Sequence, residues 1–260
     1  MKIATWNVNS LRVRLDHLLA WLQDNPVDVI GLQETKLVDA KFPAQEIEAA
    51  GYQVVFAGQP TYNGVALLTR RDTVGEPLNV IAGNPNFPDE QQRLITATCA
   101  GIRVTCAYVP NGQAVDSDKY DYKLRWLDAL TGWLDEGAGE PGTPRVLLGD
   151  FNIAPDDRDV HDPEAWKDKI LCSVPERERL QKLLALGMVD SFRLFEQAER
   201  SFSWWDYRQL GFRRNAGLRI DLVLVDEVLR PRVKASEIDK TPRRLEKPSD
   251  HAPAICTIES

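Results

Sequence analysis

The chain has 260 residues, of which 43% are hydrophobic and 27% are charged. This length allows one large core, so we expect a single domain over residues 1–260. The net charge of -7 excludes a protein that holds nucleic acid by bulk positive charge alone, and the longest apolar runs are too short for a signal peptide or a membrane span. We expect a soluble, cytoplasmic protein.

The excess of acidic residues does not exclude DNA as a partner. Local clusters of basic residues can still contact phosphates, and a metal site itself requires several carboxylates. The four cysteines are Cys99, Cys106, Cys172 and Cys256, and their wide spacing lacks the pairs of a metal-ligand motif. We expect them to be reduced thiols in the core.

Short runs rich in β-branched and aromatic residues recur along the chain and predict strands. The expected strands cover 2–6, 27–32, 52–56, 65–69, 94–98, 103–109, 145–148, 220–225 and 252–258. Leucines at helical spacing predict helices over 15–22, 124–134 and 180–186. Stretches rich in Gly, Pro, Asn and Asp predict surface loops at 75–92, 137–144 and 154–169.

Several of these strands follow one another with only a turn between them, at 62–64 and around Gly101, which favours antiparallel pairing. The predicted fold class is therefore α+β. We expect two mixed, largely antiparallel β-sheets packed as a sandwich, with helices on the outside.

Polar residues occupy the ends of the predicted strands, where a buried sheet would prefer apolar side chains. These positions are Asn7, Asn9, Glu34, Lys36, Tyr108, Asn111, Asp150, Asn152, Asp221, Asp250 and His251. Because a sheet lays its strand ends side by side, we expect these residues to converge on one face of the sandwich.

Glu34 is a candidate Mg²⁺ ligand, since Mg²⁺ prefers hard oxygen donors, although a surface glutamate after a strand is the alternative. Asp150 and Asn152 alternate with Phe151, so an extended backbone would place both polar side chains on one face. A turn over residues 149–152 is the alternative, because Gly, Asp and Asn favour turns.

His251 is the most informative of the three histidines, because it follows an acid at the start of a strand. An imidazole can stabilise charge that develops on a phosphate, and a carboxylate can fix its tautomer. Neighbouring side chains on a strand point in opposite directions, so Asp221 is a better partner for His251 than Asp250. We expect His17 and His161 to be structural or surface residues.

Taken together, these residues resemble the exonuclease III branch of the AP endonucleases, within the superfamily of endonucleases, exonucleases and phosphatases. The resemblance covers almost the entire chain, and the order and spacing of its motifs are specific. The matching blocks are Trp6-Asn7-Val8-Asn9-Ser10-Leu11-Arg12, Gln33-Glu34-Thr35-Lys36, Asn63-Gly64-Val65-Ala66, Gly149-Asp150-Phe151-Asn152-Ile153, Trp204-Trp205-Asp206-Tyr207-Arg208, Gly217-Leu218-Arg219-Ile220-Asp221 and Lys247-Pro248-Ser249-Asp250-His251-Ala252-Pro253.

The resemblance implies a DNase I-like four-layer sandwich and a Mg²⁺-dependent DNA-repair nuclease, with Mn²⁺ as a possible substitute. Such an enzyme cuts 5′ to abasic sites and removes blocked or normal nucleotides from 3′ ends, leaving a 3′-hydroxyl. The metal ligands that it implies are Asn7, Glu34, Asp150, Asn152, Asp250 and His251. The catalytic residues that it implies are Tyr108, Asp150, Asn152, Asp221 and His251.

In these roles Asp150 activates the attacking water with Asn152, while His251, held by Asp221, and Tyr108 contact the phosphate. Some family members carry an acid where this chain has Asn9, which leaves a contribution of that position to metal binding open.

The partner implied is double-stranded DNA with abasic sites or 3′ ends. The resemblance also implies a monomer that does not bind membranes. Trp204, Leu218 and Ile220 are expected around a flipped-out abasic sugar, although core aromatics are an alternative reading of the two tryptophans. Lys36, Arg93, Asn111 and Arg219 are expected to contact the DNA backbone. The loop over 156–166, with His161, is expected to influence which DNA ends are preferred.

Two other functions remain open from the sequence. A metal-dependent phosphatase or sphingomyelinase would use the same metal and histidine machinery, but Trp204-Trp205 and the block over 217–221 favour DNA. A non-catalytic DNA-binding protein could keep the fold, but the polar positions at the strand ends are all present.

Overall fold

In the computed structural model, which describes residues 1–259, the strands form two six-stranded sheets. The first has the strand order β11-β12-β1-β2-β4-β3. Its strands are β1 (Lys2–Asn7), β2 (Val29–Gln33), β3 (Tyr52–Ala57), β4 (Val65–Arg70), β11 (Val233–Ile238) and β12 (Ala254–Ile258). Within it only β1 and β2 run parallel among the described pairs.

The second sheet has the order β5-β6-β7-β8-β10-β9. Its strands are β5 (Leu78–Ala82), β6 (Leu94–Cys99), β7 (Ile102–Tyr108), β8 (Arg145–Asp150), β9 (Met188–Asp190) and β10 (Asp221–Asp226). The pair β7 and β8 is parallel, and the other described pairs are antiparallel. Both sheets are therefore mixed and largely antiparallel, as predicted.

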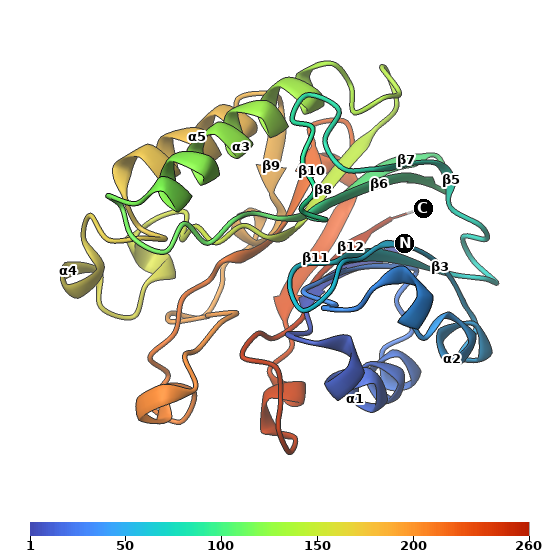
Figure 1. Ribbon diagram of the computed structural model, residues 1–260, viewed down its shortest axis with the longest axis horizontal. Helices are drawn as coiled ribbons and strands as arrows, with labels where there is room; N and C mark the ends of the chain where they lie inside the picture. Colours follow the sequence, from blue (N-terminus) through green and yellow to red (C-terminus); the bar gives the residue numbers. More distant parts are fainter. Residues whose placement is uncertain (260) are drawn as a thin grey trace.

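Helices cover the outer faces of the two sheets (Figure 1). The helices are α1 (Leu11–Asp24), α2 (Ala44–Ala49), α3 (Asp118–Asp135), α4 (Pro163–Trp166) and α5 (Val174–Leu184). Short 3₁₀ segments are η1 (Asp39–Lys41), η2 (Asp157–Asp159), η3 (Ser191–Leu194), η4 (Arg208–Leu210), η5 (Arg230–Arg232) and η6 (Thr241–Arg244). Helices α1 and α2 pack on the first sheet, and α3 and α5 pack on the second, which gives the expected four layers.

Apolar side chains fill the three spaces between these layers. Between the sheets, Val29 and Leu67 of the first sheet meet Val104 and Leu148 of the second. The close approach of the sheets is visible at Gly31, where an added Cβ would lie 2.2 Å from Leu148 Cδ1. The cores under the two helical layers contain most of the leucines that predicted the helices. The four cysteines are free and buried, as predicted.

The structure corrects three expectations about elements. The loop predicted over 75–92 contains strand β5, and strands β9 and β11 and helix α2 were not predicted at all. The loop predicted over 154–169 contains η2 and the short helix α4. No helix of residues 1–259 is long and apolar enough to span a membrane.

Candidate active site

Strand direction gathers the predicted polar residues at one edge of the sandwich. The parallel pairs β1–β2 and β7–β8 end together, with Asn7 opposite Gln33 and Tyr108 opposite Asp150. Strand β10 runs antiparallel to β8, so its first residue, Asp221, also lies opposite Asp150. The site is therefore made where strands of both sheets end or begin.

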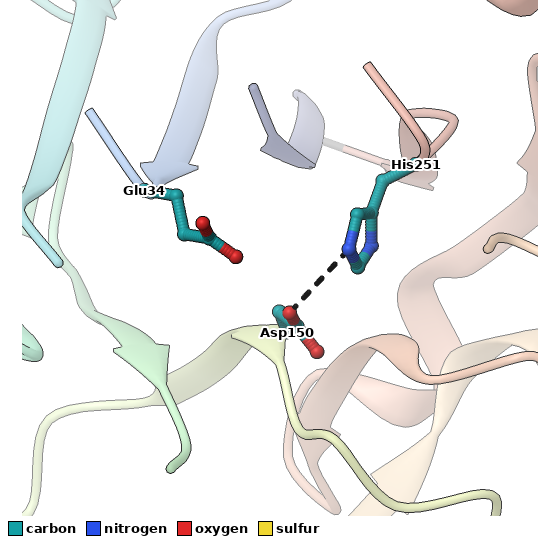
Figure 2. Close-up of side chains that lie close together, drawn as sticks. All are labelled: Glu34, Asp150 and His251. Carbon is teal, nitrogen blue, oxygen red and sulfur yellow. Dashed lines mark ion pairs between the residues drawn. The ribbon is translucent and has the colours of Figure 1, made fainter. Parts of the chain in front are cut away.

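Glu34, Asp150 and His251 form the centre of this site, which we call the acidic centre. Figure 2 shows their side chains pointing toward one another from three different segments. One ligand atom from each lies within 4.8 Å of the others. His251 Nε2 is 3.7 Å from Asp150 Oδ2, and both side chains are nearly buried.

Asn7 joins the two carboxylates of the acidic centre. Its side-chain Nδ2 donates to Glu34 Oε1 and to Asp150 Oδ2, both at 2.9 Å. Its Oδ1 accepts a hydrogen bond from the backbone N–H of Asn9 at 2.9 Å. The fully buried amide of Asn7 thus sets the separation of two negative charges that belong to different sheets.

His251 is held by Asp221, as the sequence predicted. His251 Nδ1 lies 2.9 Å from Asp221 Oδ2 and 3.1 Å from Oδ1, which turns Nε2 toward Asp150. Ser203 Oγ accepts from the backbone N–H groups of Ile220 and Asp221 and so fixes the start of β10. A carboxylate on Nδ1 is the usual way to fix the orientation and tautomer of a functional imidazole.

Burial and charge act in opposite directions on His251. Burial alone lowers the pKa of this imidazole, but the charges of Asp221 and Asp150 outweigh it and raise the pKa to about 10. The site therefore holds an imidazolium at neutral pH.

Burial also raises the pKa of Asp150, to about 7, with His251 acting against the increase and Asp221 adding to it. A carboxyl group with a pKa near the working pH is suited to accept a proton from water.

Glu34 has a different environment, in which its negative charge is stabilised. Burial alone would raise its pKa, but Lys36 and the amide of Asn7 outweigh this and lower it. Lys36 Nζ lies 2.8 Å from Glu34 Oε2, and the hydroxyl of Tyr108 donates to Oε1 at 2.9 Å. Burial and the charges of Glu34 and Asp150 keep the pKa of Tyr108 well above its usual value, so the phenol stays a donor.

The alternation of Asp150, Phe151 and Asn152 does not come from an extended backbone, so that prediction is wrong. Strand β8 ends at Asp150, and Asn152 has a positive φ of 47°. The turn considered as the alternative is present, with Asn152 N donating to Asp150 Oδ1 at 2.9 Å. Asn152 Oδ1 accepts from Asn111 Nδ2 at 3.1 Å, so the turn still brings these polar groups together.

Asp250 does not join the acidic centre. Its Oδ1 accepts from Asn9 Nδ2 at 2.9 Å, and its Oδ2 accepts from Trp204 Nε1 at 3.0 Å. Asn9 in turn accepts from Lys36 Nζ at 2.6 Å. Asn9 therefore links Asp250 to Lys36. Asp250, a predicted metal ligand, is separated from the carboxylates of Glu34 and Asp150 by these hydrogen-bonded side chains.

The acidic centre fits a divalent metal ion by its chemistry. Two carboxylates and an imidazole lie close enough to share one ion, and carboxylate oxygens are the donors that hard divalent cations prefer. Glu34 is the most accessible of the three, with 18% of its side chain exposed. The stabilised charge of Glu34 is what an incoming cation requires.

Arg219 cannot contact the DNA backbone, so this prediction is wrong. Its side chain is 1% exposed, and its guanidinium is paired with Asp159 and Asp190 at 2.6 and 2.7 Å. The arginine ties the η2 segment to the start of β10 instead. The other predicted backbone contacts, Lys36, Arg93 and Asn111, keep exposed or half-exposed side chains beside the acidic centre.

The predicted apolar sugar pocket also needs correction. Leu218 and Ile220 are 0% and 1% exposed and pack in a small core beneath Trp204, so neither offers a surface to DNA. Trp204 does line a cavity of about 430 Å³, but His161 and Trp166 line it as well. His161 Nδ1 is hydrogen-bonded to Gly217 O at 3.1 Å, and Trp205 is a core aromatic, as the alternative reading held.

Sequence reasoning missed Lys123, whose buried ammonium lies beneath the site. A signal was present, because Lys123 falls on the buried stripe of α3 with Tyr120, Leu127, Leu130 and Leu134. A lysine in such a stripe is rarely fully buried without a partner.

The chain matches the model of the "Endonuclease/Exonuclease/phosphatase family" over residues 4–251. It is 37% identical to exodeoxyribonuclease III of Haemophilus influenzae over 266 residues, which covers 97% of this chain and 98% of that protein. Among solved structures, a 3′ phosphatase from Neisseria bound to a product DNA hairpin is 46% identical, with a TM-score of 0.95 and full coverage of both chains. An AP endonuclease from Archaeoglobus fulgidus is 38% identical, with a TM-score of 0.93 and full coverage of both chains.

The family match spans the segment that contains every residue of the acidic centre, and the similarity to these proteins extends over whole chains. The chain therefore belongs to the endonuclease/exonuclease/phosphatase family and, within it, to the exonuclease III branch of the AP endonucleases.

Proposed function

We propose that this hydrolytic DNA-repair nuclease uses Mg²⁺ to cleave phosphodiester bonds 5′ to abasic sites and at blocked or normal 3′ ends of duplex DNA. The observation that carries the proposal is the convergence of Glu34, Asp150 and His251 within 4.8 Å at the junction of the two sheets. The similarity to an exodeoxyribonuclease III, to an AP endonuclease and to a 3′ phosphatase supports these three substrates.

In this proposal, Asp150 accepts a proton from the attacking water. The water oxygen forms a bond to phosphorus, the bond from phosphorus to the 3′ oxygen breaks, and the leaving 3′ oxygen takes up a proton from solvent to become the 3′-hydroxyl. Asn152, hydrogen-bonded to Asp150, holds that carboxylate and the water in position. A base whose pKa lies near the working pH contributes about 10²- to 10⁴-fold to such a step.

His251, in the acidic centre, and Tyr108, which is hydrogen-bonded to Glu34, bind the phosphate. The imidazolium of His251, maintained by Asp221, opposes the negative charge that develops on the phosphate oxygens, and the phenol of Tyr108 donates to one of them. Glu34 would hold the metal with Asp150, supported by Asn7, while His251 stays protonated beside the phosphate. When bound, the ion supplies positive charge for the phosphate and the leaving oxygen.

Substrate binding uses the partly exposed side chains around this centre. Lys36, Arg93 and Asn111 lie beside Tyr108 and Glu34 and can contact phosphates, while Trp204 offers an aromatic face next to the cavity that it shares with His161. Contacts of this kind position a duplex without reading its sequence.

We further propose that the protein acts as a single-domain monomer in the cytoplasm. Every residue of the acidic centre comes from one chain, and the four free, buried cysteines suit a reducing compartment.

The test is cleavage of a labelled duplex with one abasic-site analogue, beside an undamaged duplex with a recessed 3′ end, with Mg²⁺, with Mn²⁺ and with a chelator. We expect metal-dependent incision 5′ to the lesion and shortening of the recessed end. Asp150→Asn should reduce both rates by about 10²-fold or more. Asp135→Asn, at the exposed end of α3, is the matched control and should retain the wild-type rates.

Three outcomes would contradict the proposal. Wild-type rates in Asp150→Asn would remove the assigned base, and full activity in chelator would remove the metal. Turnover of a soluble inositol phosphate or sphingomyelin, without cleavage of either duplex, would replace the nuclease by the phosphatase or sphingomyelinase alternative.

A further inference from the structure

A buried ion pair lies directly beneath the catalytic loops, outside every role assigned so far. Lys123 of α3 and Glu176 of α5 are paired through Nζ and Oε1, and both side chains are 0% exposed. Removing two charges from water is costly, and a buried pair is often no more stable than two apolar residues of similar volume. Stability alone therefore gives little reason for an ion pair at this position.

The lysine has further contacts that an apolar side chain could not make. Its ammonium also donates to the backbone carbonyl of Asn152 at 2.7 Å and to that of Asn111 at 3.1 Å. An ammonium has three donors, so Glu176, Asn152 and Asn111 use all of them. One buried cation thus joins the loop after β7 to the loop after β8.

These two loops carry groups that surround the catalytic carboxylate. Asn152 N donates to Asp150 Oδ1, and Asn111 Nδ2 donates to Asn152 Oδ1. The backbone of Asn152 is left-handed, with a φ of 47°, which costs free energy in a residue other than glycine. An inward-facing carbonyl at such a residue needs a strong buried donor to hold it.

Glu176 fixes the position of the lysine in turn. Its Oε1 accepts from the backbone N–H of Leu171 at 3.1 Å, and its Oε2 accepts from that of Ser173 at 3.1 Å. Glu176 lies in the first turn of α5, where an acidic side chain interacts favourably with the helix N-terminus. The carboxylate is therefore anchored before it meets Lys123.

We propose that Lys123 is a positioning residue of the nuclease, whose buried ammonium holds the loops of Asn111 and Asn152 so that Asp150 faces the acidic centre. Glu176 is the counter-ion of this ammonium and acts against burial, which lowers the pKa of Lys123. The inference rests on the proposed function, because the geometry that it maintains is that of the proposed base.

The decisive variant is Lys123→Met/Glu176→Gln, which replaces the pair by neutral side chains of similar size and leaves no unpaired buried charge. We expect kcat per folded molecule to fall about 10²-fold, because a displacement near 1 Å at a catalytic group has an effect of this order. KM for the duplex should change less than kcat, since no DNA-binding side chain is removed and Asn111 alone among them shifts with its loop. Lys123→Arg, which restores a cationic donor, should recover part of kcat.

Hydrogen–deuterium exchange supplies a readout that does not depend on cleavage. In the double variant the segments over 109–112 and 151–154 should exchange faster, because Val109 N–H bonds to Asp150 O at the base of both loops. Leu130→Ala, at a fully buried position of the same helix, is the control for general destabilisation. It should lower stability without a selective change in these loops or in kcat per folded molecule.

A purely structural pair would be revealed by unchanged kcat and unchanged exchange of both loops in the double variant, and this result would overturn the inference. A fall in kcat matched by Leu130→Ala at equal loss of stability would overturn it as well. A wild-type protein that cleaves no DNA would instead contradict the proposed function, while the exchange measurement would still decide whether Lys123 holds the loops.

Discussion

His251 shows how burial and neighbouring charges compete in one side chain. Its pKa is raised from 6.5 to about 10 because Asp221 and Asp150 outweigh the effect of burial. A pKa that is higher in the folded than in the unfolded state stabilises the fold fully below the unfolded value. This contribution is lost as the pH rises through about 10.

Asp150 acts in the same direction at lower pH. Its pKa is raised from 3.8 to about 7, so the folded protein holds this proton more tightly than the unfolded chain does. The stability from its protonated form is present below 3.8 and is lost as the pH rises through about 7. Both groups therefore make the metal-free fold less stable as the pH rises.

The first prediction concerns His251→Gln, measured by urea unfolding in chelator between pH 6 and pH 10. We expect wild type to be more stable than the variant near pH 6, and the difference to shrink toward pH 10 by about 2 kcal/mol or more, since each pKa unit corresponds to about 1.4 kcal/mol. A constant difference between wild type and His251→Gln would contradict the ion pairs assigned to His251.

The residue types of the acidic centre could be predicted from the sequence, but the contacts of several of them could not. Asp221 was identified as the partner of His251 because adjacent side chains on a strand face opposite ways, and the structure agrees. Arg219 was misassigned because a cation beside a catalytic block resembles a phosphate contact. Its partners, Asp159 and Asp190, lie 60 and 29 residues away in sequence, and only the fold brings them together.

At the scale of elements, the junction of β7 and β8 determines where Asp150 points. Gly149 has a φ of +151°, and an added Cβ would lie 1.8 Å from the carbonyl oxygen of Ala107 on β7. Any side chain here must push the two strands apart next to the base. The close approach of these backbones therefore depends on glycine.

We predict that Gly149→Ala lowers kcat on an abasic duplex by about 10²-fold, because Asp150 moves with the end of β8. The variant should also unfold at lower urea concentration than wild type. Gly132→Ala on α3 is the matched control, since an added Cβ there meets only Asn86 Nδ2 at an ordinary 3.5 Å. Equal activity of the two variants would show that the spacing of β7 and β8 does not determine the position of the Asp150 carboxylate.

A second prediction at this scale separates a structural arginine from a DNA contact. Arg219→Met removes the ion pairs with Asp159 and Asp190 and leaves Asp159 paired with the partly exposed Arg193, so we expect a loss of about 1.5–3 kcal/mol in the free energy of unfolding. Duplex binding is compared in proteins that also carry Asp150→Asn. Adding Arg219→Met to this background should leave the slope of log K against log salt concentration unchanged. Lys36→Met should instead reduce the slope of log K against log salt concentration by about 1.

These measurements are urea unfolding and fluorescence anisotropy of a labelled duplex at several salt concentrations. A stable Arg219→Met protein with a reduced salt slope would restore the DNA-contact role that its burial excludes.

The strands that the sequence did not predict share a place in the fold. Strands β5, β9 and β11 all lie at the edge of a sheet, where a strand needs less apolar sequence. In β11 most side chains are at least partly exposed, and in β5 Leu78 and Val80 face solvent. The central strands were predictable because both of their faces are covered, so nearly every residue is apolar.

At the scale of the whole molecule, the acidic centre connects two sheets that otherwise meet mainly through apolar packing. Glu34 follows β2 and His251 precedes β12 in the first sheet, while Asp150 ends β8 in the second. An ion held by these residues would link the sheets in the folded protein only. Such binding stabilises the fold by mass action.

We therefore predict that the melting temperature of the wild-type protein rises with Mg²⁺ concentration. At 100 times the dissociation constant the gain is about 2.7 kcal/mol, which for a chain of this size corresponds to a shift of several degrees. Glu34→Gln keeps the size of the side chain but loses the charge that Lys36 and Asn7 stabilise, so its melting temperature should be nearly independent of Mg²⁺.

Differential scanning calorimetry over a Mg²⁺ titration measures this difference, with Glu46→Gln on the exposed face of α2 as the matched control. The control should follow wild type, because Glu46 is exposed on α2 and does not belong to the acidic centre. If Glu34→Gln gained as much stability from Mg²⁺ as wild type, the ion would bind elsewhere. The two sheets would then be joined at the acidic centre only by the hydrogen bonds of Asn7, Tyr108 and His251.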